Sequence, residues 1–203
     1  MKDLPESPNA ELAYLFRHAM LRDAAYNLQL PGDRARMHWL AHSLIEAAFG
    51  GPLPPAAPYS KESSAPHQLD AIASELARHA RFALDGGLNA LQPLRCALRR
   101  AADYAERQYR HAEALEHWLQ LLDFCEPVDR GWVLVRLARQ MFFVQRVADA
   151  EARLREAIEL ARQHRDVALE ARAMSTLGSV LRQTERGHET GALYQRALEL
   201  QRT

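Results

Sequence analysis

The chain has 203 residues, of which 48% are hydrophobic and 26% are charged, as is ordinary for a folded globular protein. Its 26 basic residues balance its 26 acidic residues, which argues against a broad electrostatic surface for duplex nucleic acid or an anionic membrane. No run approaches the ~18 apolar residues of a membrane span, and the amino terminus lacks the apolar region of a signal peptide. We therefore expect a cytoplasmic protein with no nucleic acid or membrane partner.

Helix-forming residues dominate the sequence. Alanine, leucine, arginine, glutamate and glutamine are abundant, whereas isoleucine occurs only at Ile45, Ile72 and Ile158. The composition predicts an all-α fold. Two isolated cysteines, Cys96 and Cys125, indicate neither a disulfide framework nor a zinc site, and no cofactor is expected.

Residues 1–49 are expected to form an N-terminal helical segment. Residues 11–17 fit a strand or a helix equally well, because a short apolar run is ambiguous by period alone. A first helix is predicted from Ala19 to Leu28. Asp33 is then a good N-cap for a second helix, which ends before Gly50. This second helix carries one apolar stripe, formed by Met37, Leu40, Ala41, Leu44, Ile45 and Ala48.

Residues 50–68 contain half of the prolines in the chain. Such a density of proline excludes a helix and predicts a flexible, semi-extended surface linker that is dispensable for stability. Two overlapping PxxP matches, Pro52 to Pro55 and Pro55 to Pro58, also fit a ligand of an SH3-like domain. We favour the linker, since short proline motifs arise freely in proline-rich loops.

Residues 69–203 show helical periodicity throughout. A stripe from Leu69 to Leu84 predicts one helix, and its partner is expected from Asn89 to Gln108 with Pro93 in the first turn. Loop signals then separate five further helices, near 111–125, 129–145, 147–164, 166–184 and 188–201.

One hairpin pattern appears three times in this region. Its second helix reads Ala114-x-x-x-Trp118-x-x-Leu121, then Ala150-x-x-x-Leu154-x-x-Ala157, then Thr190-x-x-x-Tyr194-x-x-Ala197. Twelve residues before each opening position stands another small residue, namely Ala102, Ala138 or Gly178. The period is 36 and then 40 residues, near the roughly 34 of a tetratricopeptide repeat (TPR). The region therefore resembles a TPR array, which implies a right-handed superhelix of antiparallel helical hairpins, an α-solenoid.

A second resemblance covers about forty residues near the amino terminus. It rests on the run from Phe16 to Tyr26, FRHAMLRDAAY, followed by Arg34 to His38 and by Ile45 to Ala48. This pattern is similar to the segment that follows the ATPase and winged-helix parts of large STAND-type signalling ATPases. In those proteins a repeat array follows as the regulatory or sensor arm. This chain has no GxxxxGK[ST] phosphate-binding loop, so the resemblance implies a detached arm.

The sequence contains only weak motifs for metal binding or catalysis. His38 and His42 lie one helical turn apart, a spacing that metal-binding helices use, and His18 or His79 would be candidate third ligands. The residues between them lack the glutamate of HExxH, so we favour hydrogen bonding between helices or surface exposure and predict no metal site. No GxSxG elbow or cysteine–histidine neighbour appears. We predict that the chain is not an enzyme.

The repeat alignment also predicts a partner-binding surface. If Ala102, Ala138 and Gly178 face the second helix of each hairpin, neighbouring positions line the concave side of the superhelix. A peptide with a carboxylate beside an apolar anchor would suit this groove. The alternative is that Trp132 and Phe142 pack on the next hairpin and that the arginines are merely solvated. The predicted groove residues are Arg99, Asp103, Glu106, Trp132, Val135, Arg139, Phe142, Arg172, Ser175, Ser179 and Arg182.

Two functions are compatible with these patterns. The first is a scaffold that binds a protein or peptide partner, as the regulatory arm of a signalling ATPase system. The second is a sensor in which the same superhelix closes on a small effector. The last helix carries Leu193, Tyr194, Ala197, Leu198 and Leu200, more apolar residues than one hairpin covers. We therefore also expect this edge to stack on another copy, as a homo-oligomer, or on further sequence.

Overall fold

Every regular element that the structure describes is helical. The computed structural model describes residues 20–21, 23–24, 26–184, 188 and 190–202, and these contain no β-strand. The predicted all-α fold is confirmed for this part of the chain. The ambiguous residues 11–17, His18 and the start of the FRHAMLRDAAY run lie outside it. The helices are α2 (Pro31–Ala48), the 3₁₀ helix η1 (Gln68–Ile72), α3 (Ala73–Asp85), α4 (Leu91–Arg107), α5 (His111–Phe124), α6 (Arg130–Phe143), α7 (Val147–His164), α8 (Val167–Leu181) and α9 (Thr190–Arg202).

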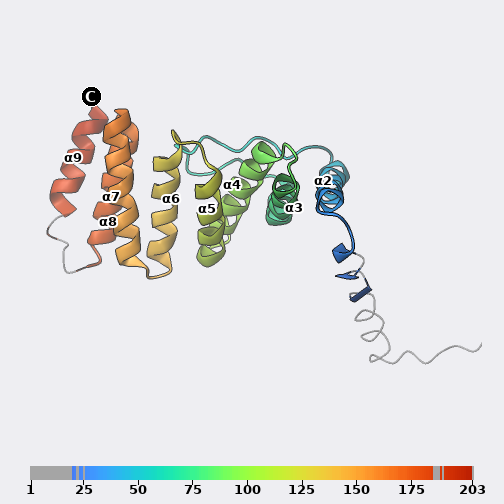
Figure 1. Cartoon of the computed structure of the whole chain (residues 1–203). Helices are drawn as coiled ribbons and strands as arrows, with labels where there is room; N and C mark the ends of the chain where they lie inside the picture. The colour runs from blue at the N-terminus through green and yellow to red at the C-terminus, as the bar shows by residue number, and fades with distance from the viewer. Residues whose placement is uncertain (1–19, 22, 25, 185–187, 189, 203) are drawn as a thin grey trace, which may run out of the picture.

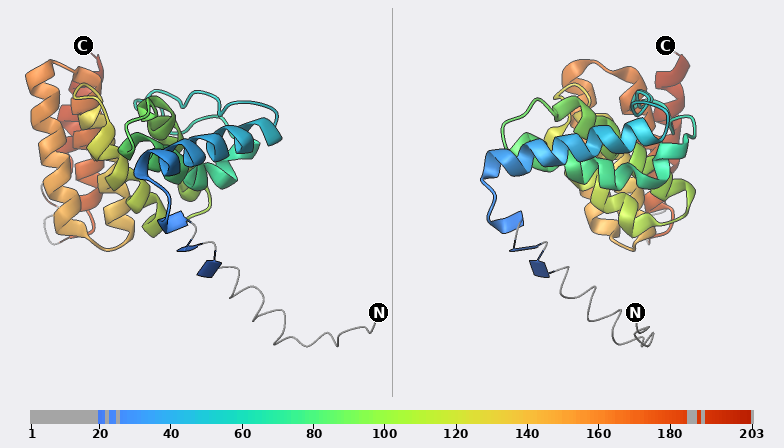
Figure 2. Two further views of the ribbon diagram at one scale, coloured as in Figure 1. Left: turned by 45° about the vertical axis from the view of Figure 1, so that its right-hand side comes forward. Right: turned by 90° about the vertical axis from the view of Figure 1, so that its right-hand side faces the viewer.

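Successive helices pack side by side in a row (Figure 1). Helix α4 packs on α5, α6 on α7 and α8 on α9, which are the pairs that the sequence pattern predicts. Contacts of α5 with α6 and of α7 with α8 join one pair to the next. Helix α2 packs on α3 and runs across the row in a different direction from α7 and α8 (Figure 2). Each helix is thus covered mainly by its neighbours in sequence.

The aligned small positions are buried where the paired helices touch. Ala102 and Ala138 are fully buried, as are Trp118 and Leu154 in the second helices of their pairs. Gly178 lies so close to α9 that a Cβ atom there would be 2.9 Å from Cε1 of Tyr194. The small residue therefore makes room for the large one at the same offset in the third pair.

The turns within the first two pairs also have the same geometry. Tyr109 and Gln145, 36 residues apart, both have left-handed backbone, with φ of 56° and 64°. The following amides, of Arg110 and Arg146, donate to carbonyl oxygens five residues earlier at 2.9 and 2.8 Å. This arrangement closes a helix end and satisfies carbonyl groups that the helix leaves unpaired. The sequence repeat is thus accompanied by a repeated turn.

Helix α2 buries only part of its apolar stripe. Met37, Leu40 and Leu44 are exposed, whereas Ile45 is half-buried and packs on the core. The buried residues of α2 are Ala35, His38 and His42. Contact with α3, rather than side-chain hydrophobicity, decides which face of α2 is covered. Helix α2 also begins earlier than predicted. Pro31 lies in its first turn, whereas the prediction had the helix begin after an N-cap at Asp33.

Residues 50–68, which we call the proline-rich segment, lie against the helices (Figure 1). Leu53 and Tyr59 pack partly buried on the hydrophobic core, and Ser64 is buried. Up to His67, where η1 begins at the next residue, the segment has no helix or strand, as its prolines predict. The composition predicted a flexible linker, but side-chain and backbone groups of the segment contact the helices. The amino-acid composition does not show that backbone carbonyl oxygens of this segment accept hydrogen bonds from the buried side chains of Arg99 and Arg100.

No helix among the described residues is both long and apolar enough to cross a membrane.

Candidate functional site

The proline-rich segment crosses a surface formed by α4, α6 and α8. We call this the α4–α6–α8 surface, and three of the predicted groove residues, Arg99, Arg139 and Arg172, contact the segment there. The segment reaches all three helices through polar contacts. The backbone amide of Ser64 donates to Asp103 of α4 at 2.9 Å, and Arg99 donates to the carbonyl oxygen of Lys61 at 3.1 Å. Glu62 contacts arginines of α6 and α8.

Glu62 lies between two of the predicted groove arginines. Its carboxylate accepts a hydrogen bond from Arg172 at 2.6 Å, and the same oxygen is 4.0 Å from Arg139. The hydrogen bond from Arg172 is the main reason that the pKa of Glu62 is lowered. Arg139 and Arg172 therefore hold a carboxylate, the group predicted for a bound peptide, although here it comes from the chain itself.

The α4 end of the surface is a buried ionic network. Arg99 and Asp103 are both 1% exposed and form an ion pair at 3.2 Å. Arg136 of α6 lies 3.4 Å from Asp103 and 2.8 Å from Glu106, and Glu106 also accepts from the indole of Trp118 at 2.7 Å. Burial lowers the pKa of Arg99, and the pairing with Asp103 opposes this. Arg99, Asp103 and Glu106 therefore join helices together, and they are not a free recognition surface.

A second buried network ties the proline-rich segment to α4. Arg100, 3% exposed, donates to the carbonyl oxygen of Pro54 at 2.8 Å and to Asp70 of η1 at 2.7 Å. Arg107 pairs with the other oxygen of Asp70. Sequence reasoning missed Arg100, Asp70 and Glu62, because a charged residue in a helical or proline-rich run gives no sign of its partner.

The predicted aromatic groove is only partly present. Trp132 is half-buried and its indole donates to Asp166, the N-cap of α8, at 3.1 Å. Phe142 is also half-buried and packs on the hydrophobic core. Val135 is 3% exposed and belongs to that core. Of these three predicted groove residues, Val135 is misplaced, and Trp132 contacts the next helical pair, as the alternative interpretation predicted.

The α8 residues of the predicted groove point in several directions. The hydroxyl of Ser179 donates to the carbonyl oxygen of Ser175 at 3.1 Å and lies 3.0 Å from the hydroxyl of Tyr194 in α9. Arg182 is exposed at the end of α8. Ser179 thus contributes to the α8–α9 contact, while Arg172 contacts the proline-rich segment.

The histidines form interhelical contacts. Nδ1 of His38 in α2 is 2.8 Å from Nδ1 of His79 in α3, and its Nε2 is 2.8 Å from the hydroxyl of Tyr26. The His38 ring also stacks on Phe82 at 4.4 Å between centroids. His42 is buried 3.5 Å from Glu46. Within the described ranges, no group of three or more His, Cys, Asp or Glu side chains is placed to hold a metal ion.

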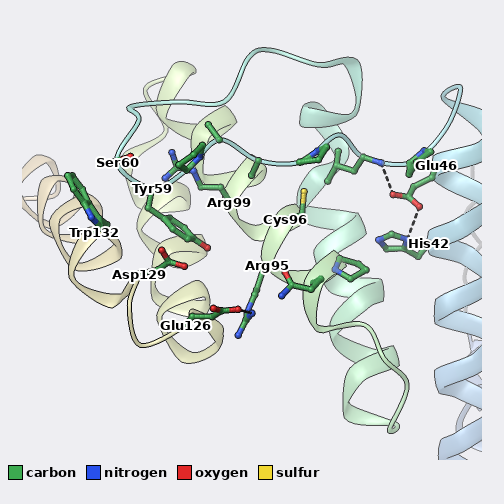
Figure 3. A pocket seen from close by; sticks show the side chains of 18 of the residues that line it. His42, Glu46, Tyr59, Ser60, Arg95, Cys96, Arg99, Glu126, Asp129 and Trp132 are labelled. Carbon is green, nitrogen blue, oxygen red and sulfur yellow. Dashed lines mark hydrogen bonds and ion pairs between the residues drawn. The ribbon is translucent and has the colours of Figure 1, made fainter. Parts of the chain in front are cut away.

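A cavity of about 680 Å³ lies beneath the proline-rich segment. It is bounded by α2, residues 52–60, α4, and the loop between α5 and α6 (Figure 3). Its polar lining includes His42 and Glu46 at one end and Asp129 at the other (Figure 3). The repeat pattern gives no indication of this cavity, because it forms only where the proline-rich segment covers the helices.

No protein-family model matches the sequence, and a search of curated proteins also finds no match.

Proposed function

We propose that this chain is a non-catalytic protein-interaction module that binds an extended, carboxylate-bearing peptide or protein segment on its α4–α6–α8 surface. The architecture in this proposal is a TPR-like α-solenoid, a right-handed superhelix of antiparallel hairpins. Its support is the threefold sequence pattern, the packing of successive helices and the repeated turn at Tyr109 and Gln145.

The observation that carries the proposal is the position of the proline-rich segment. An extended stretch of polypeptide already lies on this surface, with its Glu62 carboxylate at Arg172 and its Lys61 carbonyl oxygen at Arg99. Arginine forks suit carboxylates, and proline-rich segments lose little conformational entropy on binding. The contacts of Glu62 are exposed, so the pair with Arg172 contributes at most about 1 kcal/mol. A partner segment that carries a carboxylate at this position is therefore able to replace Glu62.

The biological setting is a second part of this proposal. The resemblance to the segment after the ATPase of STAND-type proteins supports a role as the regulatory arm of such a system. An ATPase with a phosphate-binding loop, encoded upstream in the same reading frame, would support this setting, and unrelated neighbouring sequence would argue against it. Self-association through α9 also remains a proposal, for which the exposed side chain of Leu198 is the support.

The binding proposal is tested with a labelled peptide that copies residues 52–66. Its affinity is compared between the wild-type chain and Glu62→Ala, in which the internal carboxylate is removed. We expect tighter binding to Glu62→Ala, and about tenfold weaker binding when Arg172→Ala is added, because a charge-assisted hydrogen bond is lost.

Arg155→Ala is the matched control, since Arg155 pairs with Glu151 on α7, away from the proline-rich segment. Circular dichroism checks that each variant is folded. Equal affinity for all four proteins would overturn the assignment of this surface.

A further inference from the structure

The cavity under the proline-rich segment has the size and walls of a small-molecule site. Its volume of about 680 Å³ falls within the 300–1,000 Å³ typical of ligand pockets. Aromatic side chains come from three parts of the chain, Trp39 of α2, Tyr59 of the proline-rich segment and Trp132 of α6. Prolines of the segment and Pro93 of α4 contribute further apolar surface to the cavity wall. A ligand with an apolar body is therefore favoured.

The two arginines that line the cavity are already neutralised. Arg95 donates to the carbonyl oxygen of Phe124 and to Glu126, the latter at 2.7 Å. Arg99 pairs with Asp103 and lies over the rings of Tyr59 and Trp118. Both arginines thus already have a carboxylate partner within the protein.

Asp129 is the lining carboxylate at the Trp132 end without a cationic partner. In the part of the chain that the structure describes, its side chain makes no ion pair and no hydrogen bond, although it stands at the N-cap position of α6. Burial, together with the nearby charge of Glu126, raises the pKa of Asp129, and Arg95 only partly offsets this. The carboxylate is thus held in surroundings that favour a positive neighbour.

Two aromatic rings line the same end of the cavity as this carboxylate. In Figure 3 the ring of Tyr59 lies next to Asp129, and Trp132, from α6, stands farther off at the same end. Trp132 follows Asp129 by three residues, and hence by about one helical turn. Aromatic faces together with one carboxylate are the elements that proteins use to bind ammonium groups.

We propose that this cavity binds a small organic cation, an amine carried on an aromatic or apolar body. The ammonium group lies at Asp129 beside Tyr59 and Trp132, and the body extends along the proline-lined wall toward α2. This site is distinct from the α4–α6–α8 contact of Glu62, and it gives the sensor interpretation of the sequence a specific place in the fold. Because Tyr59 belongs to the proline-rich segment, ligand binding also holds that segment in position.

The experiment uses three probes that share a phenylethyl body, and the whole chain. Phenethylammonium is the cation, 2-phenylethanol is the neutral analogue and 3-phenylpropionate is the anion. Isothermal titration at pH 7.5 is expected to give a dissociation constant of about 1 mM for the cation, as a fragment of this size allows, and at least about tenfold weaker binding of the other two.

Variants then locate the site. Asp129→Asn keeps the shape of the side chain and is expected to weaken phenethylammonium binding about tenfold. Trp132→Leu should weaken it as well, through loss of the aromatic face. Asp123→Asn, at an exposed position of α5, is the control and should leave the affinity unchanged. Cation binding should also weaken as the pH falls through the raised pKa of Asp129.

Four results would overturn the proposal. The first three are no binding of phenethylammonium up to about 20 mM, equal binding of the alcohol, and an affinity that Asp129→Asn leaves unchanged in a folded protein. Preferred binding of phenylpropionate would assign the cavity to anions and would equally overturn it.

Discussion

Glu62 and Arg172 stand 110 positions apart in the sequence and form a hydrogen bond of 2.6 Å. This contact connects the proline-rich segment near the amino terminus to α8 near the other end of the helical row. The intervening helices are joined mainly to their neighbours. The segment is therefore the part of the described chain that links distant helices directly, and its role in stability can be measured.

Replacing residues 52–66 with a Gly/Ser linker of equal length should destabilise the protein. Arg99 and Arg100 are buried and would lose carbonyl acceptors at Lys61 and Pro54. Both arginines keep their carboxylate partners, but a flexible linker does not hold its carbonyl oxygens in place, and each hydrogen bond lost to a charged group costs about 1.5–3 kcal/mol. Together these losses correspond to a fall in melting temperature of roughly 10 °C for a domain of this size. A calorimetric shift of only a few degrees would support the flexible, dispensable linker of the sequence-based prediction.

Asp70→Ala should be among the most damaging single substitutions. Asp70 is 2% exposed and holds Arg100 and Arg107, so its removal leaves the buried guanidinium of Arg100 without its anion. The expected loss of unfolding free energy is about 3–5 kcal/mol in urea titrations. Asp123→Ala at an exposed site is the control and should cost less than about 0.5 kcal/mol. Similar values for the two variants would exclude a stabilising role for the network.

The docking of α2 depends on the absence of a side chain at Gly86. A Cβ atom there would lie only 2.2 Å from Cβ of Ala35, and neither group has a flexible end that can move aside. Gly86→Ala should therefore displace α2 and increase amide hydrogen exchange in that helix. Adding Ala35→Gly should restore much of the protection. If the double variant exchanged as fast as the single one, another effect of Gly86→Ala would be responsible.

Stability should decrease as the pH falls below about 6.5, the ordinary pKa of histidine. Burial is the largest cause of the lowered pKa values of His42 and His117, and Glu46 and Glu113 respectively oppose it. Between 6.5 and the lowered pKa, the unfolded chain binds protons that the folded chain does not. Unfolding is therefore favoured by up to about 1.4 kcal/mol per pH unit for each group.

Urea titrations at pH 7.5 and 5.5 check this prediction. His117→Gln should reduce the difference between the two pH values, while His164→Gln, at an exposed position, should preserve it. An unchanged difference in His117→Gln would mean that other groups carry the pH dependence.

The helices of residues 69–203 could be predicted closely from the sequence. Helices near 111–125 and 147–164 correspond to α5 and α7 within one residue at each end. Leu98 and Ala102 are buried at positions that the 3.6-residue period selects. These features depend on local helix propensity and on contacts with the next helix. Both leave a regular pattern in a repeated sequence and can therefore be predicted from it.

The candidate site could be predicted only in part. Arg139 and Arg172, which the helical period assigns to one face, both contact Glu62, because the period fixes the direction of a helical side chain. Their partner Glu62 was missed, since an extended segment has no period that shows which side chains face the helices. The exposure of Met37, Leu40 and Leu44 on α2 also could not be predicted from the stripe. Packing of Ala35 on Gly86 favours burial of one face of α2, whereas side-chain hydrophobicity favours burial of the other face.

The rate at which the Cys96 thiol is labelled reports movement of the proline-rich segment. Its half-buried thiol donates to the carbonyl oxygen of Pro54 at 3.3 Å, and burial raises the pKa of the thiol. A maleimide or disulfide reagent needs the thiolate and an open path, so alkylation of Cys96 requires the segment to lift away. In a Cys125→Ser background, the labelling rate measures how often the chain uncovers this surface. A peptide that displaces the segment should accelerate labelling, whereas an amine held in the cavity should slow it.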